Sequence, residues 1–387
     1  MITQSVEVAE QADARVSKTR EGNLMWVRFP PSAPSYKRFP IVLFFLILSM
    51  LLYSCAKNDK ITQWAEQDPL LRSRLRLNHV NIDTIPRQVV IAQEMVYYTQ
   101  AGDIRKLNYL LAHGANVSAR VGPWDMLEYA VSSGHLKIVK LFLSKGADIN
   151  SRDPEGDTPL MLAKSFRIFK FLIHHGAEIN VKDDNGNTAA MKAAPEEAKY
   201  LLVHGANINA HNDKGKTLLM QALAKGHSSF AKYLILHGAN IHIRDINGRT
   251  PLMYAVRADI PEMELFLIQR GANLNAEDKD GKTVLIHAVL NNNVGSVKFL
   301  LNHGASVNAA DKQGDTPLID AVEKPSERLI QSDLIGNSPK DFAIYRHQMI
   351  KLLLSHGANR YAKNKKGETA LSTAVKNGFI KSVKLLK

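Results

Sequence analysis

The sequence predicts an all-α solenoid of about nine helix-turn-helix units joined by β-hairpin-like turns, and three observations indicate this class. The first is a Gly-Ala pair, preceded each time by histidine or a cation, that recurs along the chain. Consecutive glycines lie 32, 30, 29, 33, 33, 33 and 53 residues apart, so one unit repeats, is trimmed twice and is enlarged once. These glycines are Gly114, Gly146, Gly176, Gly205, Gly238, Gly271, Gly304 and Gly357.

The second observation is that each unit carries the pattern of two short helices. In the clearest unit Thr250 is placed to cap the first helix, and Pro251 suits its first position, where a missing N–H costs nothing. Gly271 supplies the left-handed residue that ends the second helix. Apolar residues recur at helical spacing on both helices: Leu252, Ala255, Met263, Phe266 and Leu267. A single pair cannot bury this face alone, so neighbouring pairs must cover it.

The third observation is a turn frame, an Asp or Asn followed three residues later by glycine and five later by threonine. It begins at Asp153, Asp183, Asn212, Asp245, Asp278, Asp311 and Asn364. A β-turn followed by two helices, with a T-P-L-H-x-A signature, resembles the ankyrin repeat family. The resemblance covers roughly residues 90–387. It implies that the hairpin tips and the exposed side of the first helices bind another protein.

The chain departs from the family pattern in two ways. The signature histidine is replaced by Met161, Met191, Met220, Met253, Ile286, Ile319 and Ser372, so we expect apolar packing to hold the inner helices. The units that end at Gly176 and Gly205 lack three and four residues where their helices join. These two trimmed units should therefore have short or 3₁₀-like first helices.

The candidate partner-binding residues are mostly cations in the centre of the repeats. Carried over from the family, the binding surface holds Lys214, Lys216, Gln221, Arg249, Tyr254, Lys279, Lys282 and His287. Gln221, Tyr254 and His287 would form its aromatic and polar floor. We expect an acidic protein segment to dock across the fifth to seventh units. The alternative for any single residue is a solvated charged rim that binds nothing.

The segment before the repeats predicts a membrane anchor. Residues 41–53 are an uncharged apolar run that follows Lys37 and Arg38, a length that fits a signal-peptide core better than a membrane span. Residues 52–55 resemble the bacterial lipobox, in which the cysteine is lipidated, and Cys55 is the single cysteine. Residues 35–55 thus form a lipoprotein signal, with the membrane contact at 41–55. An uncleaved signal anchor and an accidental apolar run are the alternatives.

The remaining segments complete the predicted domain organisation. Residues 1–34 look like translation across a tRNA gene and are excluded from the fold. Residues 56–90 form a tether, either a stalk without regular structure or a segment with one short helix near Trp64. Residues 91–387 form the repeat domain, with an insertion at about 323–347 that is either a tolerated surface loop or a partner-specific flap. Short helical turns are predicted to begin at Pro325-Ser326 and Ser338-Pro339.

Charge and residue pattern bear on the other function classes. The formal net charge is +13, which raises nucleic acid as a partner, but the excess is spread over the repeats without interleaved aromatic and basic residues. The histidines before the recurrent glycines could suggest a metal array. Helices packed about 8–10 Å apart cannot share one zinc ion through them, so we expect them to close helix C-termini. They are His113, His175, His204, His237, His303 and His356.

No phosphate loop, metal cluster or activated nucleophile is evident, so the sequence predicts neither an enzyme nor a cofactor. The expected function is a monomeric protein-binding scaffold anchored at a bacterial cell envelope, with its repeats outside the cytoplasm. One alternative is an exported bacterial effector that engages host proteins. Another is a structural envelope component without a dedicated ligand.

Overall fold

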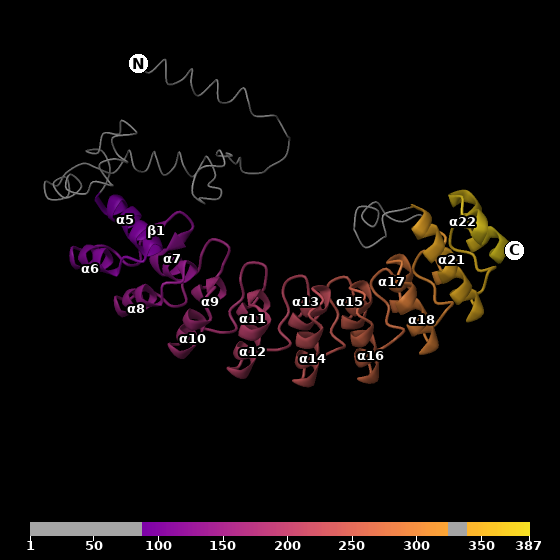
Figure 1. The fold of residues 1–387 in the computed structure, drawn as a ribbon, viewed down its shortest axis with the longest axis horizontal. Coiled ribbons are helices and arrows are strands. Elements are labelled where there is room, and N and C mark those ends of the chain that lie inside the picture. The colour runs from indigo at the N-terminus through magenta and orange to yellow at the C-terminus, as the bar shows by residue number, and fades with distance from the viewer. Residues whose placement is uncertain (1–86, 324–338) are drawn as a thin grey trace, which may run out of the picture. The chain divides into compact units, whose positions relative to one another are not determined.

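The computed structural model describes residues 87–323 and 339–387, and Figure 1 shows their helices in consecutive pairs. The predicted extension at 1–34, the anchor with Cys55 and nearly all of the tether lie outside the described residues. So does the first part of the insertion, including Pro325-Ser326. The chain divides into two compact units, with the boundary between Asp148 and Ile149.

Within residues 87–148 the first unit contains two helix pairs and one small hairpin. Helix α5 pairs with α6, and α7 pairs with α8, while α5 also packs on α7. Strand β1 pairs antiparallel with β2, and the Tyr129 hydroxyl donates to the Val121 carbonyl at 2.8 Å. The bounds are α5 Arg87–Ala101, α6 Ile104–Ala112, β1 Arg120–Val121, β2 Trp124–Asp125, α7 Met126–Ser133 and α8 Leu136–Ser144. Helix α5 thus begins inside the segment predicted as a tether.

The second unit is a stack of helix pairs in which first helices pack on first helices and second helices on second helices. Figure 1 shows the second helices on one side of this unit and the hairpin loops on the other. The earlier pairs are α9 Pro159–Leu162 with α10 Phe166–His174, α11 Ala189–Lys192 with α12 Pro195–Val203, and α13 Leu218–Ala224 with α14 Ser228–Leu236. The later pairs are α15 Pro251–Arg257 with α16 Pro261–Gln269, α17 Val284–Leu290 with α18 Val294–Asn302, α19 Pro317–Asp320 with α21 Pro339–Ser355, and α22 Ala370–Asn377 with α23 Ile380–Leu386. This arrangement is the predicted all-α solenoid.

The core follows the predicted apolar spacing. Leu252 and Ala255 on α15, and Met263 and Leu267 on α16, are buried. Phe266 is only half-buried. The residues that replace the signature histidine are also buried from Met191 to Ile319, whereas Met161 is half-buried and Ser372 is exposed. Apolar packing therefore does hold most of the first helices, as expected.

The predicted β-hairpin-like turns are confirmed by antiparallel bridges such as Lys182 with Thr188 and Glu277 with Thr283. Consecutive hairpins are joined by backbone hydrogen bonds. The Lys279 N–H, for example, donates to the Asn247 carbonyl at 2.8 Å. Gly248 has φ +78, and a Cβ there would lie 2.8 Å from the Lys279 nitrogen. Only glycine suits this position, because it needs both a left-handed backbone and close contact with the next hairpin.

The helix ends carry the expected residues, but the threonine cap bond forms at only some of them, and Thr158 and Thr188 make none. Gly271 has φ +87, as predicted for the residue that ends α16. Thr217 and Thr283 accept a hydrogen bond from the third N–H of their helices. Thr250 occupies the N-cap of α15 with Pro251 first in the helix, but its side chain makes no cap bond. The predicted capping bond of Thr250 is therefore wrong, although its position is correct.

The histidines before the recurrent glycines close helix C-termini, as predicted. Each places its Nδ1 within 2.7–2.9 Å of the carbonyl oxygen four residues earlier. Because a carbonyl can only accept, Nδ1 carries the proton and donates it. The ring thus adds a second hydrogen bond to a carbonyl in the last turn that already accepts the backbone N–H of the same histidine, at 3.1–3.2 Å.

The irregular units show the predicted effect of residue number on helix length. In the trimmed units α9 and α11 have 4 residues each, whereas α13, α15 and α17 have 7 each. Helix α19, just before the insertion, also has 4 residues. The short turn predicted at Ser338-Pro339 is wrong in length, because α21 begins at Pro339 and continues for 17 residues.

Candidate functional site

The candidate site is built on one repeated position, the residue just before the threonine of each hairpin, which we name the hairpin column. In the second unit the column changes sign from acidic to cationic and back. Its members are Asp157, Asn187, Lys216, Arg249, Lys282, Asp315 and Glu368. These residues occupy equivalent positions, because the hairpins repeat with the same backbone hydrogen bonds. The three cations therefore follow one another on three consecutive hairpins.

The cations of this region differ in what they contact. Lys214 and Lys279, at the hairpin tips, are exposed. Lys216 is half-buried, with Nζ 5.5 Å from the centre of the Tyr254 ring, and Lys282 lies 3.7 Å from an Asp311 carboxylate oxygen. Arg249 is half-buried, and its buried Nε has no hydrogen-bond partner among the described residues. Arg249 Nε is thus a buried donor without a partner in this part of the chain.

The predicted aromatic and polar floor is largely occupied by structural contacts. Tyr254 is 5% exposed, and its hydroxyl donates to Asp245 Oδ2 at 2.8 Å. Burial, followed by the hydrogen bond to Asp245, raises the pKa of Tyr254. His287 lies 2.9 Å from Asp278 Oδ2, while Gln221 is half-buried. Tyr254 and His287 therefore anchor their helices to their own hairpins, and the expectation of an exposed floor is wrong for Tyr254.

The contact of His287 also affects the hairpin carboxylate. Burial by itself would raise the pKa of Asp278, but hydrogen bonds from His287 and the Lys282 backbone outweigh it and lower that pKa. Asp278 also accepts the N–H groups of Asp280 and Lys282, at 2.9 and 3.0 Å. The charged carboxylate is thus an integral part of the turn.

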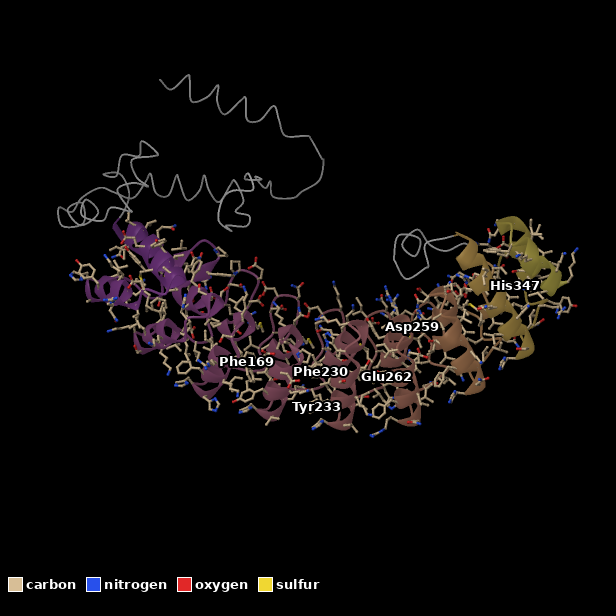
Figure 2. All side chains as sticks on the ribbon, in the orientation of Figure 1. Phe169, Phe230, Tyr233, Asp259, Glu262 and His347 are labelled. Atoms are coloured by element: carbon tan, nitrogen blue, oxygen red, sulfur yellow. The ribbon has the colours of Figure 1, made fainter. Side chains whose placement is uncertain are left out.

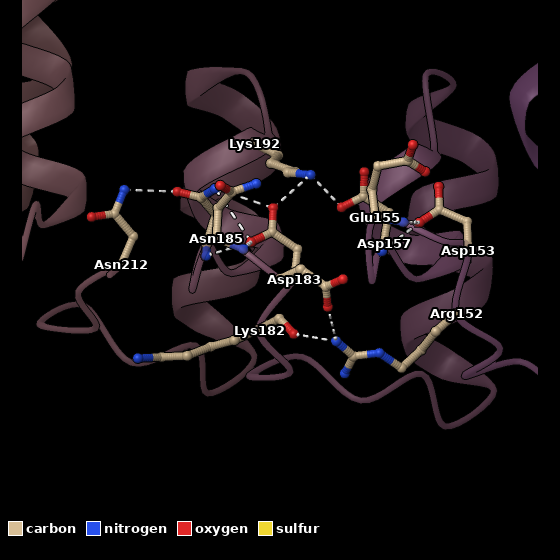
Figure 3. Close-up of polar contacts among 11 residues, drawn as sticks. Arg152, Asp153, Glu155, Asp157, Lys182, Asp183, Asn185, Lys192 and Asn212 are labelled. Carbon is tan, nitrogen blue, oxygen red and sulfur yellow. Dashed lines mark hydrogen bonds and ion pairs between the residues drawn. The ribbon is translucent and has the colours of Figure 1, made fainter. Parts of the chain in front are cut away.

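The trimmed units neutralise their hairpin charges internally (Figure 3). Lys192, at the position equivalent to Tyr254 and His287, pairs with both Asp157 and Asp183, and its Nζ lies 2.7 Å from Asp183 Oδ2. Burial raises the pKa of Asp183, but hydrogen bonds from Lys192 and Asn187 outweigh it, so the pKa is lowered. The acidic start of the hairpin column is therefore paired with a cation of its own chain.

Near the other end of the column, α19 carries a buried acidic group that sequence reasoning missed. Asp320 is 3% exposed, and burial, followed by the nearby Asp311 charge, raises its pKa to about 8. Arg346 on α21 donates to the Asp320 backbone carbonyl at 2.9 Å. The signal was present in the repeat, because Asp320 follows Asp311 by the same nine residues that separate Tyr254 from Asp245.

A second correction concerns the outer side of the second helices. The sequence shows no interleaving of aromatic and basic residues, but the structure places lysines of one repeat over rings of the next. Lys199 Nζ lies 5.4 Å from the centre of the Tyr233 ring, and Lys232 Nζ lies 5.3 Å from that of Phe266. The partners are 34 residues apart in the sequence, which conceals the pattern.

Two kinds of site were also sought in residues 87–323 and 339–387. Within these ranges no helix combines the length and the apolar character that a membrane crossing requires. The same residues hold no group of three or more histidine, cysteine or acidic side chains arranged to hold a metal ion.

The family of the chain follows from sequence comparison together with this fold. Residues 95–153, 127–209, 187–278 and 262–335 match the family described as ankyrin repeats in three copies. These ranges together cover more than half of the chain, which therefore belongs to the ankyrin repeat family. The family indicates a scaffold for protein-protein interaction. The total of about nine units stays a prediction.

Two curated relatives match parts of the repeats. The chain is 44% identical over 57 residues to a putative ankyrin repeat protein of Acanthamoeba polyphaga mimivirus, which is 14% of this chain and 8% of the relative. It is 37% identical over 71 residues to the 2-5A-dependent ribonuclease of Mus musculus, 18% of this chain and 10% of the relative. The matches thus span only about a tenth of the length of either relative.

Proposed function

We propose that this protein is a membrane-anchored scaffold that binds an acidic segment of a partner protein across Lys216, Arg249 and Lys282. Each helix pair counts as one repeat, which gives the predicted total of about nine. The anchor is the apolar run with Cys55, and the place is a bacterial cell envelope with the repeats outside the cytoplasm. The concave side that carries the hairpins is the binding side.

The observation that carries the proposal is the different use of charge along the hairpin column. Asp157 is paired with Lys192, whereas Arg249 keeps a buried Nε without a hydrogen bond. A carboxylate that reaches the guanidinium would form charge-assisted hydrogen bonds, the strongest kind available on such a surface. Lys214 and Lys279, exposed at the flanking hairpin tips, add attraction that speeds encounter with an acidic segment.

The test is affinity capture from native membranes, followed by mass spectrometry, with three forms of the full chain. The first is unchanged, the second carries Lys216→Glu, Arg249→Glu and Lys282→Glu, and the third carries Lys225→Glu, Lys381→Glu and Lys384→Glu as a charge-matched control. The hairpin variant should lose the stoichiometric partner, and the control should retain it. Equal recovery by both variants would refute the assignment of the site.

The anchor has its own test, because binding and membrane attachment are separate claims. Cys55→Ala should abolish incorporation of a radiolabelled fatty acid and move the protein from the membrane fraction to the soluble fraction. Release of the unchanged protein into the medium without any lipid on Cys55 would favour the exported alternative. Capture of the partner by the soluble Cys55→Ala form should remain.

A further inference from the structure

A second charged surface lies on the outer side of the second helices, away from the hairpins. Its cations sit six residues before the recurrent glycine on α10, α12, α14 and α18, and at the residue just before it on α16. We name these residues the basic stripe: Lys170, Lys199, Lys232, Arg270 and Lys298. Figure 2 shows Tyr233, the residue after Lys232, on the side of α14 that faces away from the hairpin loops.

Four of the five cations of the stripe lie over aromatic rings. Lys170 lies 5.1 Å from the centre of the Tyr200 ring, and Lys199 and Lys232 lie over the rings of Tyr233 and Phe266 in the next repeats. Cation–π contacts orient the ammonium groups while leaving their N–H donors on the solvent side. Most of these side chains are exposed, and Lys199 is half-buried. The stripe is therefore an ordered row of cations.

Helix α16 keeps a cation in the basic stripe, although its sequence lacks the lysine found at the equivalent position of the other second helices. Leu265 stands at the lysine position of α16, and Arg270 replaces the closing histidine. Arg270 lies 4.9 Å from the centre of the Phe266 ring, so α16 still contributes one ring-bound cation. Each of the second helices α10, α12, α14, α16 and α18 thus contributes one cation to the basic stripe.

The rings themselves are not available as stacking platforms. His204 stacks on Tyr200 at 4.0 Å and His237 stacks on Tyr233 at 3.9 Å, while lysines of the preceding repeats lie over the same rings. Proteins that bind single-stranded nucleic acid need ring faces on which bases can stack. The covered rings argue against that ligand.

Apolar side chains lie beside the cations on the same helices. Val203 is 75% exposed and Leu236 is 53% exposed, each two residues before the glycine that follows its helix. A phosphate backbone gains nothing from such groups, whereas a polypeptide can pack its own apolar side chains on them. The combination of cations and exposed aliphatic groups favours a protein ligand.

The stripe is also narrow. Glu196 and Glu197 begin α12 and Glu262 begins α16, so carboxylates stand at the first turns of these helices, and Glu196 Oε1 lies 2.7 Å from Lys199 Nζ. A broad anionic surface such as a bilayer would meet these carboxylates as well, and like charges would oppose it.

We propose that the basic stripe is a second binding surface, for a linear acidic polypeptide that carries apolar side chains between its carboxylates. Neighbouring helices pack about 8–10 Å apart, so five second helices span roughly 32–40 Å. An extended chain rises about 3.3 Å per residue, so some 10–12 residues would cover the stripe with one acidic residue near each cation.

The experiment uses the full chain with the hairpin cations already reversed by Lys216→Glu, Arg249→Glu and Lys282→Glu, so that the site of the proposed function cannot contribute. The probe is a fluorescein-labelled peptide of four Glu-Leu-Glu triplets, and its binding is followed by anisotropy. Adding Lys199→Glu and Lys232→Glu should weaken binding at least tenfold. Adding Lys225→Glu and Lys384→Glu instead should change it less than twofold.

Further probes test the nature of the ligand. A peptide of Glu-Ser-Glu triplets should bind several-fold more weakly than the leucine peptide, and a twelve-nucleotide oligothymidylate should compete poorly. Should Lys199→Glu and Lys232→Glu lower the helical circular dichroism, Lys199→Gln and Lys232→Gln replace them, with an expected loss of at least threefold. No binding by the hairpin-reversed chain, equal loss in both added pairs, or stronger binding of the oligonucleotide would overturn the proposal.

Discussion

The trimmed repeats and the full-length repeats of the second unit solve the same problem in different ways. In the units of α11, α15 and α17 the side chain nine residues after the start of the hairpin fastens the first helix to that hairpin. In the trimmed unit of α11 that residue is Lys192, which forms ion pairs with two carboxylates. In the full-length units of α15 and α17 it is Tyr254 or His287, which bonds a single aspartate.

This difference explains where binding capacity is found. A lysine in the trimmed unit absorbs the acidic charge of the hairpin column, so that hairpin offers little to a partner. In the full-length units Tyr254 takes one carboxylate without adding a cation, and Arg249 is left with an unpaired donor. From Asp157 to Asp315 the length of the first helix and the charge of the column thus change together.

The largest expected effect tests what the two kinds of repeat share, the contact between hairpins. Gly248→Ala in a full-length unit and Gly186→Ala in a trimmed unit would place a Cβ 2.8 and 2.7 Å from a backbone nitrogen of the next hairpin. Left-handed strain and this clash should together cost about 3–4 kcal/mol in each case, measured by urea unfolding. Gly271→Ala, with open space around its Cβ, should cost only about 1–2 kcal/mol. Unequal losses at Gly248 and Gly186 would show that the hairpin contacts differ.

The next effect is a pH dependence confined to the full-length repeats. Glu264 on α16 is fully buried, and Ser296 on α18 donates to it at 2.5 Å. Burial raises its pKa from 4.5 to about 7, so the folded state holds a proton that the unfolded state loses. The resulting stability is fully present below pH 4.5 and is lost as the pH rises through 7, a change of up to about 3 kcal/mol.

Hydrogen exchange at pH 5 and pH 8 provides the measurement, because repeats can open locally. After correction for intrinsic exchange, α16 and α18 should lose more protection at pH 8 than α10 and α12, whose equivalent residues are Phe169 and Ala198. Glu264→Gln should abolish the extra loss. An equal loss in Glu264→Gln would assign the pH dependence to another group.

The smallest effect distinguishes the two fastenings by salt. Lys192→Met leaves Asp183 without its cation, and Tyr254→Phe leaves Asp245 without its hydroxyl donor. Each should destabilise the fold by about 1–2 kcal/mol in thermal unfolding at low salt. In 1 M NaCl the cost of Lys192→Met should shrink, since salt screens a partly exposed ion pair, while that of Tyr254→Phe should persist. Lys376→Met, at an exposed pair, serves as the control and should change nothing measurable.

Much of the fold could be predicted because it depends on the spacing of residues that are close together in the sequence. Glycine period, helix pairing, the short α9 and α11, and the histidines that close helices all depend on residues within one unit. The length of α21 could not, because the insertion conceals its start. The unmade cap of Thr250 could not either, since propensity identifies a position and not the hydrogen bond made there.

The charges of the candidate site could be predicted from the sequence, but the contacts that its side chains make could not. The cations at Lys216, Arg249 and Lys282 stand out in the sequence, whereas the burial of Tyr254 depends on how α15 folds against its own hairpin. The stack of Lys199 on Tyr233 joins residues from two different repeats. Such contacts depend on how the units stack. The sequence shows the length of the repeat, but not which residues of neighbouring repeats come together.

The most direct test of the central claim compares the two kinds of hairpin in one crosslinking measurement. Ile246, exposed on a full-length hairpin, and Asp184, exposed at the same position of a trimmed hairpin, are each replaced by benzoylphenylalanine in the full chain in native membranes. After irradiation, mass spectrometry should find an acidic partner peptide joined at position 246 and none at position 184. Equal crosslinking at both positions, or crosslinking at position 184 alone, would contradict the account.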